Sequence, residues 1–294
     1  MADEYRRFWI TSRGETEREL LLAEAFEAGA EGAEVSESEG LFKACIYGPA
    51  EQIEGIRTQL IENAAEGTQI EAAEPMPEVD WSEAWKEGLD PVRVSERLVV
   101  RPPFAEYALE PGQQEVVIDP GQAFGIGGHA STRLCLEWID LLLSEEGGRA
   151  RYDRVLDVGT GSGVLALAAV KLGAAEALGF DLDPIAIEAA DEAARVNAGG
   201  AAVRFFTGPI EDVPASEAAY PMVLANLLKQ EMLPIAGAIA SRISKQGVLI
   251  LAGLLEEDVA EVLEVFGGEG LKERGRLGRS DSVGDWVGLC LEFA

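Results

Sequence analysis

Three glycines lie within five residues directly after an apolar segment, in the stretch VLDVGTGSG that begins at Val155. Asp157 stands two positions before the first of these glycines, Gly159, and Asp181 follows twenty positions after Gly161. Glycine permits a positive φ and lets a ligand approach the backbone, and a helix N-terminus adds free N–H groups. This spacing predicts a ligand-binding turn between a strand and a helix.

Three classes of ligand use such a turn. A P-loop requires Lys and then Ser or Thr after the last glycine, whereas Val164 and Leu165 follow Gly163 here. A dinucleotide fingerprint requires Gly or Ala three residues after Gly161, where Val164 stands. A carboxylate at Asp157 repels a pyrophosphate but can hold an ammonium group, directly or through water. The residues therefore favour a cofactor with an amino group over the nucleotide of an NAD-linked oxidoreductase.

The pattern D-x-G-x-G-x-G resembles motif I of the class I S-adenosylmethionine methyltransferases, whose cofactor carries an ammonium group and no phosphate. The resemblance implies that Asp181 accepts the ribose hydroxyls. We interpret Asp183 as the N-cap of the next helix, with Pro184 at its first position. The cofactor contacts that the resemblance implies within the turn are Asp157, Gly159, Thr160, Gly161 and Gly163.

Two further stretches resemble one family of this class, the PrmA-type ribosomal protein methyltransferases. DPGQAFGIGGHAST, from Asp119 to Thr132, is similar to D-P-G-x-A-F-G-T-G-x-H-x-T-T, and ANLL, from Ala225 to Leu228, stands where the family carries A-N-I-L or A-N-L. The resemblance also covers WSEAWKEGLDPVRVSERLVVRPPF and DSVGDWVGLCLEF, and so essentially the whole chain. It implies a protein N-methyltransferase that modifies lysines and the α-amino group of ribosomal protein L11.

The segment around His129 departs from the family pattern at three positions. Ile126 replaces a Thr, Ala130 a Pro and Ser131 a Thr. This altered loop leaves an alternative open, in which the chain is a non-catalytic or differently targeted relative that binds the cofactor or a basic protein. His129 is the only histidine, and we expect it to shape the loop rather than act as a general base. The cofactor contacts expected in this segment are Phe124, Gly125, His129 and Thr132.

Asn226 is the predicted catalytic residue and a further expected cofactor contact. Methyl transfer to an amine is an in-line attack on a sulfonium carbon, which needs a neutral nitrogen that is aimed more than activated. The Asn226 carbonyl can accept an amine N–H and direct the lone pair. The alternative is that Asn226 caps a helix beginning at Leu228.

The stretch TGPIED, from Thr207 to Asp212, is expected to face the adenine. Ile210 can pack on the ring, and either Glu211 or Asp212 can bind the exocyclic amine. The residues alone do not choose between these two carboxylates.

These residues must be positioned by a regular framework. From Val155 onward strands alternate with helices, which is typical of a doubly wound, Rossmann-like α/β sheet with ligands beyond the carboxyl ends of its strands. The predicted strands are 155–158, 177–180, 203–206, 222–225, 248–252 and 286–292, and the predicted helices are 164–172, 185–198, 228–243 and 256–266. A helix is also expected from Ser131 to Leu143.

A small ferredoxin-like α+β domain is predicted before this framework, at residues 1–74. Its elements are strands 4–12, 33–36, 41–47 and 68–73 and helices 16–27 and 50–63. We expect it to recognise the substrate. Residues 75–100, with Trp81 and Trp85, are predicted to form a linker, and residues 101–294 the methyltransferase domain.

The formal net charge of −29 argues against nucleic acid as a partner, because phosphate binding needs clustered Lys and Arg. It fits a basic protein partner, although general solubility or adaptation to salt explains most of these carboxylates. No apolar run reaches the roughly 18 residues of a membrane span, and no signal peptide is recognisable. Cys45, Cys135 and Cys290 lack metal-ligand spacing. We expect a cytoplasmic monomer without a metal or membrane partner.

Overall fold

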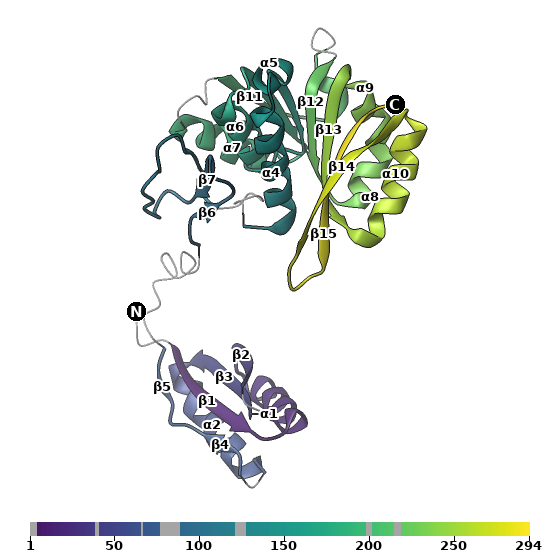
Figure 1. The fold of residues 1–294 in the computed structure, drawn as a ribbon. Coiled ribbons are helices and arrows are strands. Elements are labelled where there is room, and N and C mark those ends of the chain that lie inside the picture. Colours follow the sequence, from purple (N-terminus) through teal and green to yellow (C-terminus); the bar gives the residue numbers. More distant parts are fainter. Residues whose placement is uncertain are drawn as a thin grey trace. The chain divides into compact units, whose positions relative to one another are not determined.

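The computed structural model describes residues 5–38, 41–65, 67–76, 89–120, 128–197, 202–214 and 219–294. The chain divides into two compact units, Met1–Gly88 and Leu89–Ala294 (Figure 1). Trp81 and Trp85 lie outside the described residues.

The first unit is an antiparallel sheet with two helices packed on it. Its strands are β1 (Tyr5–Ser12), β2 (Gly32–Ser38), β3 (Leu41–Pro49), β4 (Gln69–Ile70) and β5 (Glu74–Pro75), and its helices are α1 (Glu15–Glu27) and α2 (Ala50–Asn63). The strand order is β2-β3-β1-β4, and β5 pairs with β1. Each predicted element is present, but the strand predicted over residues 68–73 is reduced to the two residues of β4.

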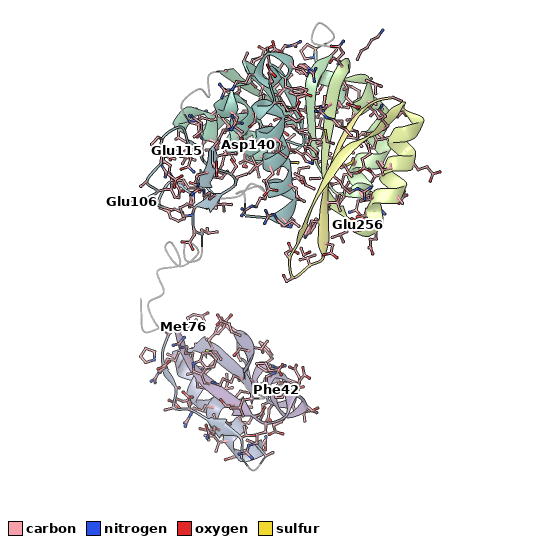
Figure 2. All side chains as sticks on the ribbon, viewed as in Figure 1. Phe42, Met76, Glu106, Glu115, Asp140 and Glu256 are labelled. Carbon is pink, nitrogen blue, oxygen red and sulfur yellow. The ribbon has the colours of Figure 1, made fainter. Side chains whose placement is uncertain are left out.

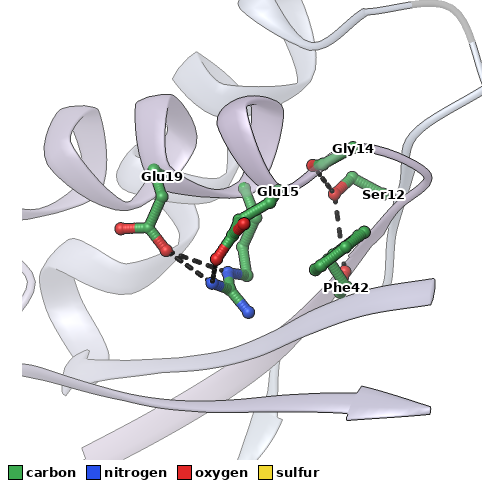
Figure 3. A network of polar contacts seen from close by, with 6 residues as sticks. Ser12, Gly14, Glu15, Glu19 and Phe42 are labelled. Carbon is green, nitrogen blue, oxygen red and sulfur yellow. Dashed lines mark hydrogen bonds and ion pairs between the residues drawn. The ribbon is translucent and has the colours of Figure 1, made fainter. Parts of the chain in front are cut away.

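Alternation along β1 builds the core of this unit. Phe8 and Ile10 are fully buried and pack with Leu21 of α1 and Ile53 of α2. Figure 3 shows the polar network at the end of this strand, where the Ser12 hydroxyl donates to the Gly14 carbonyl at 2.9 Å. This bond closes the turn from which α1 begins.

Some large apolar residues of these helices are exposed. Leu20 of α1 is 63% exposed and Ile61 of α2 is 48% exposed, so both belong to the solvent face. Arg18, by contrast, lies on the buried face of α1, where it pairs with the more exposed Glu19 at 2.6 Å and Glu15 at 3.5 Å (Figure 3).

The second unit contains a seven-stranded sheet. Its strands are β9 (Arg154–Val158), β10 (Glu176–Asp181), β11 (Val203–Thr207), β12 (Tyr220–Asn226), β13 (Ile243–Leu255), β14 (Leu271–Ser280) and β15 (Asp285–Phe293). They follow the order β11-β10-β9-β12-β13-β15-β14, in which β9 to β13 are parallel and β14 and β15 are antiparallel to their neighbours (Figure 1). The predicted doubly wound sheet is thus confirmed, and its strand order reverses between β9 and β12.

Helices cover both faces of this sheet. Val155 and Leu156, neighbours on β9, belong to different cores because alternate residues of a strand face opposite sides. The core around Val155 includes α4 (Ala130–Ser144), α6 (Val164–Leu172) and α7 (Pro184–Val196). The core around Leu156 includes α9 (Ala236–Ser241) and α10 (Val259–Gly268).

The helix after β12 and the strand β14 differ from the prediction. The helix expected over residues 228–243 is divided into α8 (Lys229–Met232), η4 (Leu233–Ile235) and α9, because Pro234 has no N–H to donate within a helix. Strand β14 was not predicted, since its sequence LKERGRLGRS is polar and only Leu271 is buried. An edge strand of this kind carries no apolar alternation that a sequence could reveal.

A three-stranded sheet precedes the large one in the second unit. It consists of β6 (Val92–Arg93), β7 (Leu98–Arg101) and β8 (Gln114–Val117), so part of the predicted linker lies within this unit. Arg97 donates to Asp140 of α4 at 2.9 Å, and Arg101 donates to Glu115 at 2.7 Å; Figure 2 labels both acceptors. The first pair attaches the small sheet to α4, and the second links β7 to β8 within that sheet. Among the described helices, none is both long and apolar enough to cross a membrane.

Candidate cofactor site at the ends of the parallel strands

A pocket of about 680 Å³ lies beyond the carboxyl ends of β9, β10 and β12. Its wall is built by the glycine turn after β9, the end of β10, residues 209–211, the end of β12, the first turn of α4 and β15. The sequence-predicted residues that line it are Gly159, Thr160, Gly161, Asp181, His129, Thr132 and Asn226. Phe124, Gly125 and Ile126 lie outside the described residues.

The glycine turn requires glycine at each of its three positions. Gly159, Gly161 and Gly163 have φ angles of 68°, 54° and 78°, which L-residues with a Cβ rarely adopt. A Cβ on Gly159 would also lie 2.5 Å from the side chain of Leu227. Gly163 is placed behind the pocket wall, where a Cβ would lie 2.7 Å from Phe205. Its role here is close packing at the start of α6.

Asp157 is likewise placed behind the wall rather than in it. Its side chain is fully buried, and its Oδ2 accepts hydrogen bonds from the Thr160 hydroxyl at 2.7 Å and the Ala166 N–H at 3.3 Å. Its Oδ1 has no hydrogen-bond partner among the described residues. Burial raises the pKa of Asp157 to about 6, although the Thr160 and Ala166 hydrogen bonds lower it. Asp157 therefore ties the glycine turn to α6, and its geometry does not favour direct contact with an ammonium group.

Asp181 presents a carboxylate held by two backbone donors. Its Oδ2 accepts the Gly161 N–H at 3.0 Å and its Oδ1 accepts the Asp183 N–H at 3.1 Å. A carboxylate oxygen has more than one lone-pair site, so both oxygens can still accept a ligand hydroxyl. Asp183 is the N-cap of α7 and accepts the Ile185 N–H at 2.9 Å, with Pro184 at the first position, as predicted.

Asn226 does not cap a helix. The N-cap of α8 is Leu228, without a side-chain bond, whereas the Asn226 Nδ2 donates to the Thr132 Oγ1 at 3.2 Å. The capping alternative is therefore excluded, and the amide remains on the wall of the pocket.

His129 shapes the start of α4. Its Nδ1 accepts the Ser131 N–H at 3.3 Å and lies 2.9 Å from the Ser131 hydroxyl oxygen, so the ring forms the N-cap of the helix. The ring also packs edge-on against Trp286, with centroids 4.7 Å apart. A nitrogen engaged in a cap is poorly placed to remove a proton from a substrate, in agreement with the predicted structural role.

Several pocket residues were not singled out from the sequence. Trp286 of β15 lines the pocket, although only the general resemblance of its stretch DSVGDWVG pointed to it. Gly253 of β13 also lines the pocket; its φ is 83°, and a Cβ would lie 2.3 Å from the Leu227 carbonyl oxygen. Of the two candidate carboxylates after β11, Glu211 lines the pocket and Asp212 does not.

The charge of the pocket limits its ligands. Its described lining contains the carboxylates of Asp181, Asp183, Glu211 and Glu231 and no Lys or Arg. Such a surface gives a phosphate no cationic partner, but it accepts hydroxyl and ammonium groups and tolerates a positive charge. No group of three His, Cys, Asp or Glu residues able to hold a metal occurs among the described residues. These hydrogen-bond acceptors therefore fit a cationic ligand that carries hydroxyl groups.

Comparison with known proteins agrees with this geometry. The family model described as "Ribosomal protein L11 methyltransferase (PrmA)" matches residues 17–291. The chain belongs to the PrmA family. Membership confirms the family resemblance stated from the sequence.

Individual PrmA relatives are substantially similar. A protein named ribosomal protein L11 methyltransferase from Geobacter sulfurreducens is 43% identical over 192 residues, which cover 65% of this chain and 60% of the relative. One of the same name from Geobacter metallireducens is 38% identical over 216 residues, covering 74% of this chain and 66% of the relative. The chain therefore spans somewhat less than two thirds of the length of these relatives.

A solved structure supports the fold. The crystal structure of a ribosomal protein L11 methylase from Lactobacillus delbrueckii subsp. bulgaricus matches with a TM-score of 0.59 and 24% identity, covering 69% of this chain and 98% of that one. At this level of identity the match is evidence for the α/β methyltransferase fold.

Proposed function

We propose that the protein is an S-adenosylmethionine-dependent N-methyltransferase that modifies lysine or N-terminal amino groups of ribosomal protein L11. One observation carries the proposal: the Asn226 amide lies on the wall of a pocket with carboxylates and no described Lys or Arg, at the point where the strand order of a PrmA-family sheet reverses. The two relatives described above are named for this activity.

The lining residues suit the parts of S-adenosylmethionine. Asp181 would accept the ribose hydroxyls, and Gly159 and Gly161 would let the cofactor approach the backbone of the turn. Ile210 would pack on the adenine, and Glu211 rather than Asp212 would accept from its exocyclic amine, since only Glu211 is part of the wall. The remaining proposed contacts are Thr160, His129, Thr132, Phe124 and Gly125, while Asp157 and Gly163 would act indirectly by holding the turn.

Bound S-adenosylmethionine supplies an electrophilic methyl group on a positively charged sulfur. The chain's task is then to aim a neutral amine, which Asn226 would do by accepting one amine N–H on its carbonyl oxygen. His129 is engaged in the α4 cap, so the substrate is expected to lose its proton to solvent. Because free lysine titrates near pH 10.4, turnover should rise with pH through the neutral range.

The first unit is proposed as the substrate-recognition domain, ferredoxin-like in topology and bounded near residue 74, with a linker to about residue 100. The β2-β3-β1-β4 order with two helices supports the topology. Of the 88 residues in this unit, 21 are acidic and 7 basic, which supports attraction to a basic protein. We further propose a cytoplasmic monomer that binds neither nucleic acid nor membranes.

The test is methylation of purified ribosomal protein L11 with labelled S-adenosylmethionine. The wild-type chain is expected to transfer label, and Asn226→Ala to lose about 100-fold or more in turnover while its cofactor affinity, measured by calorimetry, changes less than about threefold. A wild-type chain that binds the cofactor but transfers no methyl group would instead support the non-catalytic alternative. Full turnover by Asn226→Ala would remove this residue from the chemistry.

A further inference from the structure

Thr132 and Asn226 meet on the pocket wall although 94 positions separate them in the sequence. Thr132 lies in the first turn of α4 and is 0% exposed, whereas Asn226 is the last residue of β12 and is half-buried. Their contact is a single hydrogen bond, from the Asn226 Nδ2 to the Thr132 Oγ1 at 3.2 Å.

The direction of this bond decides which end of the amide faces a ligand. A side-chain amide has a donor end and an acceptor end of nearly the same shape, and the two can exchange by rotation about χ2. With the NH₂ group held by Thr132, the carbonyl oxygen is the end left for the pocket. No hydrogen bond from a described residue to that oxygen is present.

The two orientations have opposite consequences for an amine nucleophile. A carbonyl oxygen accepts an N–H from the amine and leaves the nitrogen lone pair free to attack. A rotated amide would present its NH₂ group, which would donate to that same lone pair and block the attack. The orientation of Asn226 therefore matters as much as its presence.

Thr132 is well suited to fix this orientation because its own position is restricted. The His129 cap fixes the first turn of α4, and Thr132 is buried together with the two residues before it, Ala130 and Ser131. The side chain of a buried, β-branched residue in a helix has few rotamers. Its hydroxyl oxygen is therefore held in a fixed place, and in this structure it accepts from the Asn226 Nδ2.

We propose that Thr132 is a positioning residue whose hydroxyl oxygen holds the Asn226 amide with its carbonyl toward the substrate amine. This inference rests on the proposed methyl transfer to an amine. It assigns to Thr132 a role toward Asn226, beyond the cofactor contact expected from the sequence.

The experiment compares Thr132→Val, which keeps the shape and removes the acceptor, with Thr132→Ser, which restores the hydroxyl. At saturating cofactor, Thr132→Val is expected to lower kcat for L11 methylation about tenfold, while KM for L11 stays within about twofold, because the orienting hydrogen bond is lost without loss of protein-substrate binding surface. Thr132→Ser should recover most of kcat. Ser144→Ala is the matched control, since Ser144 is an exposed hydroxyl at the far end of the same helix.

A second measurement does not depend on activity. In the ligand-free protein labelled with ¹⁵N, the side-chain amide protons of Asn226 should exchange slowly with solvent in the wild type and in Thr132→Ser, and clearly faster in Thr132→Val. Unchanged exchange in Thr132→Val would overturn the contact itself.

Measurements of kcat then test the positioning role of Thr132 separately from the proposed methyl transfer. If the wild type methylates L11 but Thr132→Val retains its kcat, or if Thr132→Ser fails to rescue, the positioning role is wrong. If Thr132→Val slows Asn226→Ala by a further tenfold, Thr132 acts through something other than Asn226. A wild type that transfers no methyl group contradicts the proposed function, and the exchange data still decide the contact.

Discussion

The two units of the chain place their carboxylates differently. The first has 21 acidic and 7 basic residues among 88, and the second has 32 acidic and 17 basic residues among 206. The first unit therefore carries about twice the net negative charge per residue. Yet none of the described carboxylates of the first unit is buried, whereas the second contains Asp157, the one buried carboxylate in the described part of the chain. The pocket with its four carboxylates also belongs to the second unit.

This difference separates two uses of negative charge. Exposed carboxylates at high density create a long-range field that attracts a basic partner. Carboxylates held by backbone donors, as Asp181 is, act over hydrogen-bond distance on one ligand. This difference supports the proposal that the first unit attracts a basic substrate and the second binds the cofactor.

Separating the units should have the largest effect. A chain beginning at Met76 is expected to bind S-adenosylmethionine normally but to methylate intact L11 at least about 100-fold less efficiently, since a loss of about 3 kcal/mol of binding energy corresponds to that factor. Calorimetry measures the cofactor affinity, and kcat/KM measures the methylation of intact L11. A short lysine peptide is the control substrate and should be methylated equally by both chains. Equal rates on intact L11 would mean that the second unit recognises the substrate by itself.

The next largest effect concerns Asp181. Asp181→Ala should weaken cofactor binding by about 1.5–3 kcal/mol, or roughly 10- to 150-fold, the scale of a hydrogen bond to a charged group. Calorimetry should give the same loss in the full chain and in the chain beginning at Met76, because the cofactor contacts lie in the second unit. Asp191→Ala is the control, as it removes an exposed carboxylate of α7 that does not line the pocket. If Asp181→Ala folds and binds with unchanged affinity, the ribose assignment fails.

The buried carboxylate predicts a pH effect on the stability of the second unit. The pKa of Asp157 is raised from 3.8 to about 6, so the folded state holds its proton more tightly than the unfolded state. The corresponding stability is fully present below about pH 4 and is lost as the pH rises through 6. Between about pH 5 and pH 8 the free energy of unfolding of the wild type should fall by about 1–1.5 kcal/mol relative to Asp157→Asn.

Urea unfolding at both pH values measures this difference, and comparison with the variant cancels the other titrating groups. Asp157→Asn keeps an oxygen that can accept the Thr160 hydroxyl. A constant difference between the two proteins across this range would show that Asp157 titrates normally.

Charge reversal on the first unit should have the smallest effect. Glu34→Lys with Glu37→Lys, two exposed positions on β2, is expected to reduce the association rate with L11 about two- to fivefold at low salt and hardly at all at high salt. Glu257→Lys with Glu264→Lys changes the net charge equally on exposed positions of η5 (Glu256–Asp258) and α10. Stopped-flow binding compares the pairs. An equal reduction in both would mean that only total charge matters.

The glycine turn could be predicted because its information is local. Gly159, Gly161 and Gly163 need positive φ, and Asp183 with Pro184 forms a cap within one turn, so spacing alone revealed them. The alternation of strands and helices likewise gave the sheet. Spacing could not reveal that Asp157 is buried behind the pocket wall whereas Asp181 lines the pocket. Both residues precede a turn, and only their burial distinguishes them.

What the sequence could not reveal depends on strands that are distant in the chain. Trp286 reaches the pocket because β15 lies between β13 and β14 in the sheet, although it follows both in the sequence. Gly253 is required by a close approach to Leu227, and Asn226 donates a hydrogen bond to a helix residue 94 positions earlier. The polar edge strand β14 left no apolar pattern. Each of these depends on tertiary contacts rather than on local preference.

The position of β15 has a consequence for biosynthesis. Because β13 pairs on one side with β15, the apolar edge that includes Leu249 and Leu251 has no partner until residues 285–293 have emerged from the ribosome. Up to that moment Trp286 is missing from the pocket, and the nascent chain exposes the unpaired, apolar edge of β13 to other chains. Translation that pauses after β13 therefore leaves an inactive chain prone to aggregation, and a chaperone acting on it would need to cover that edge first.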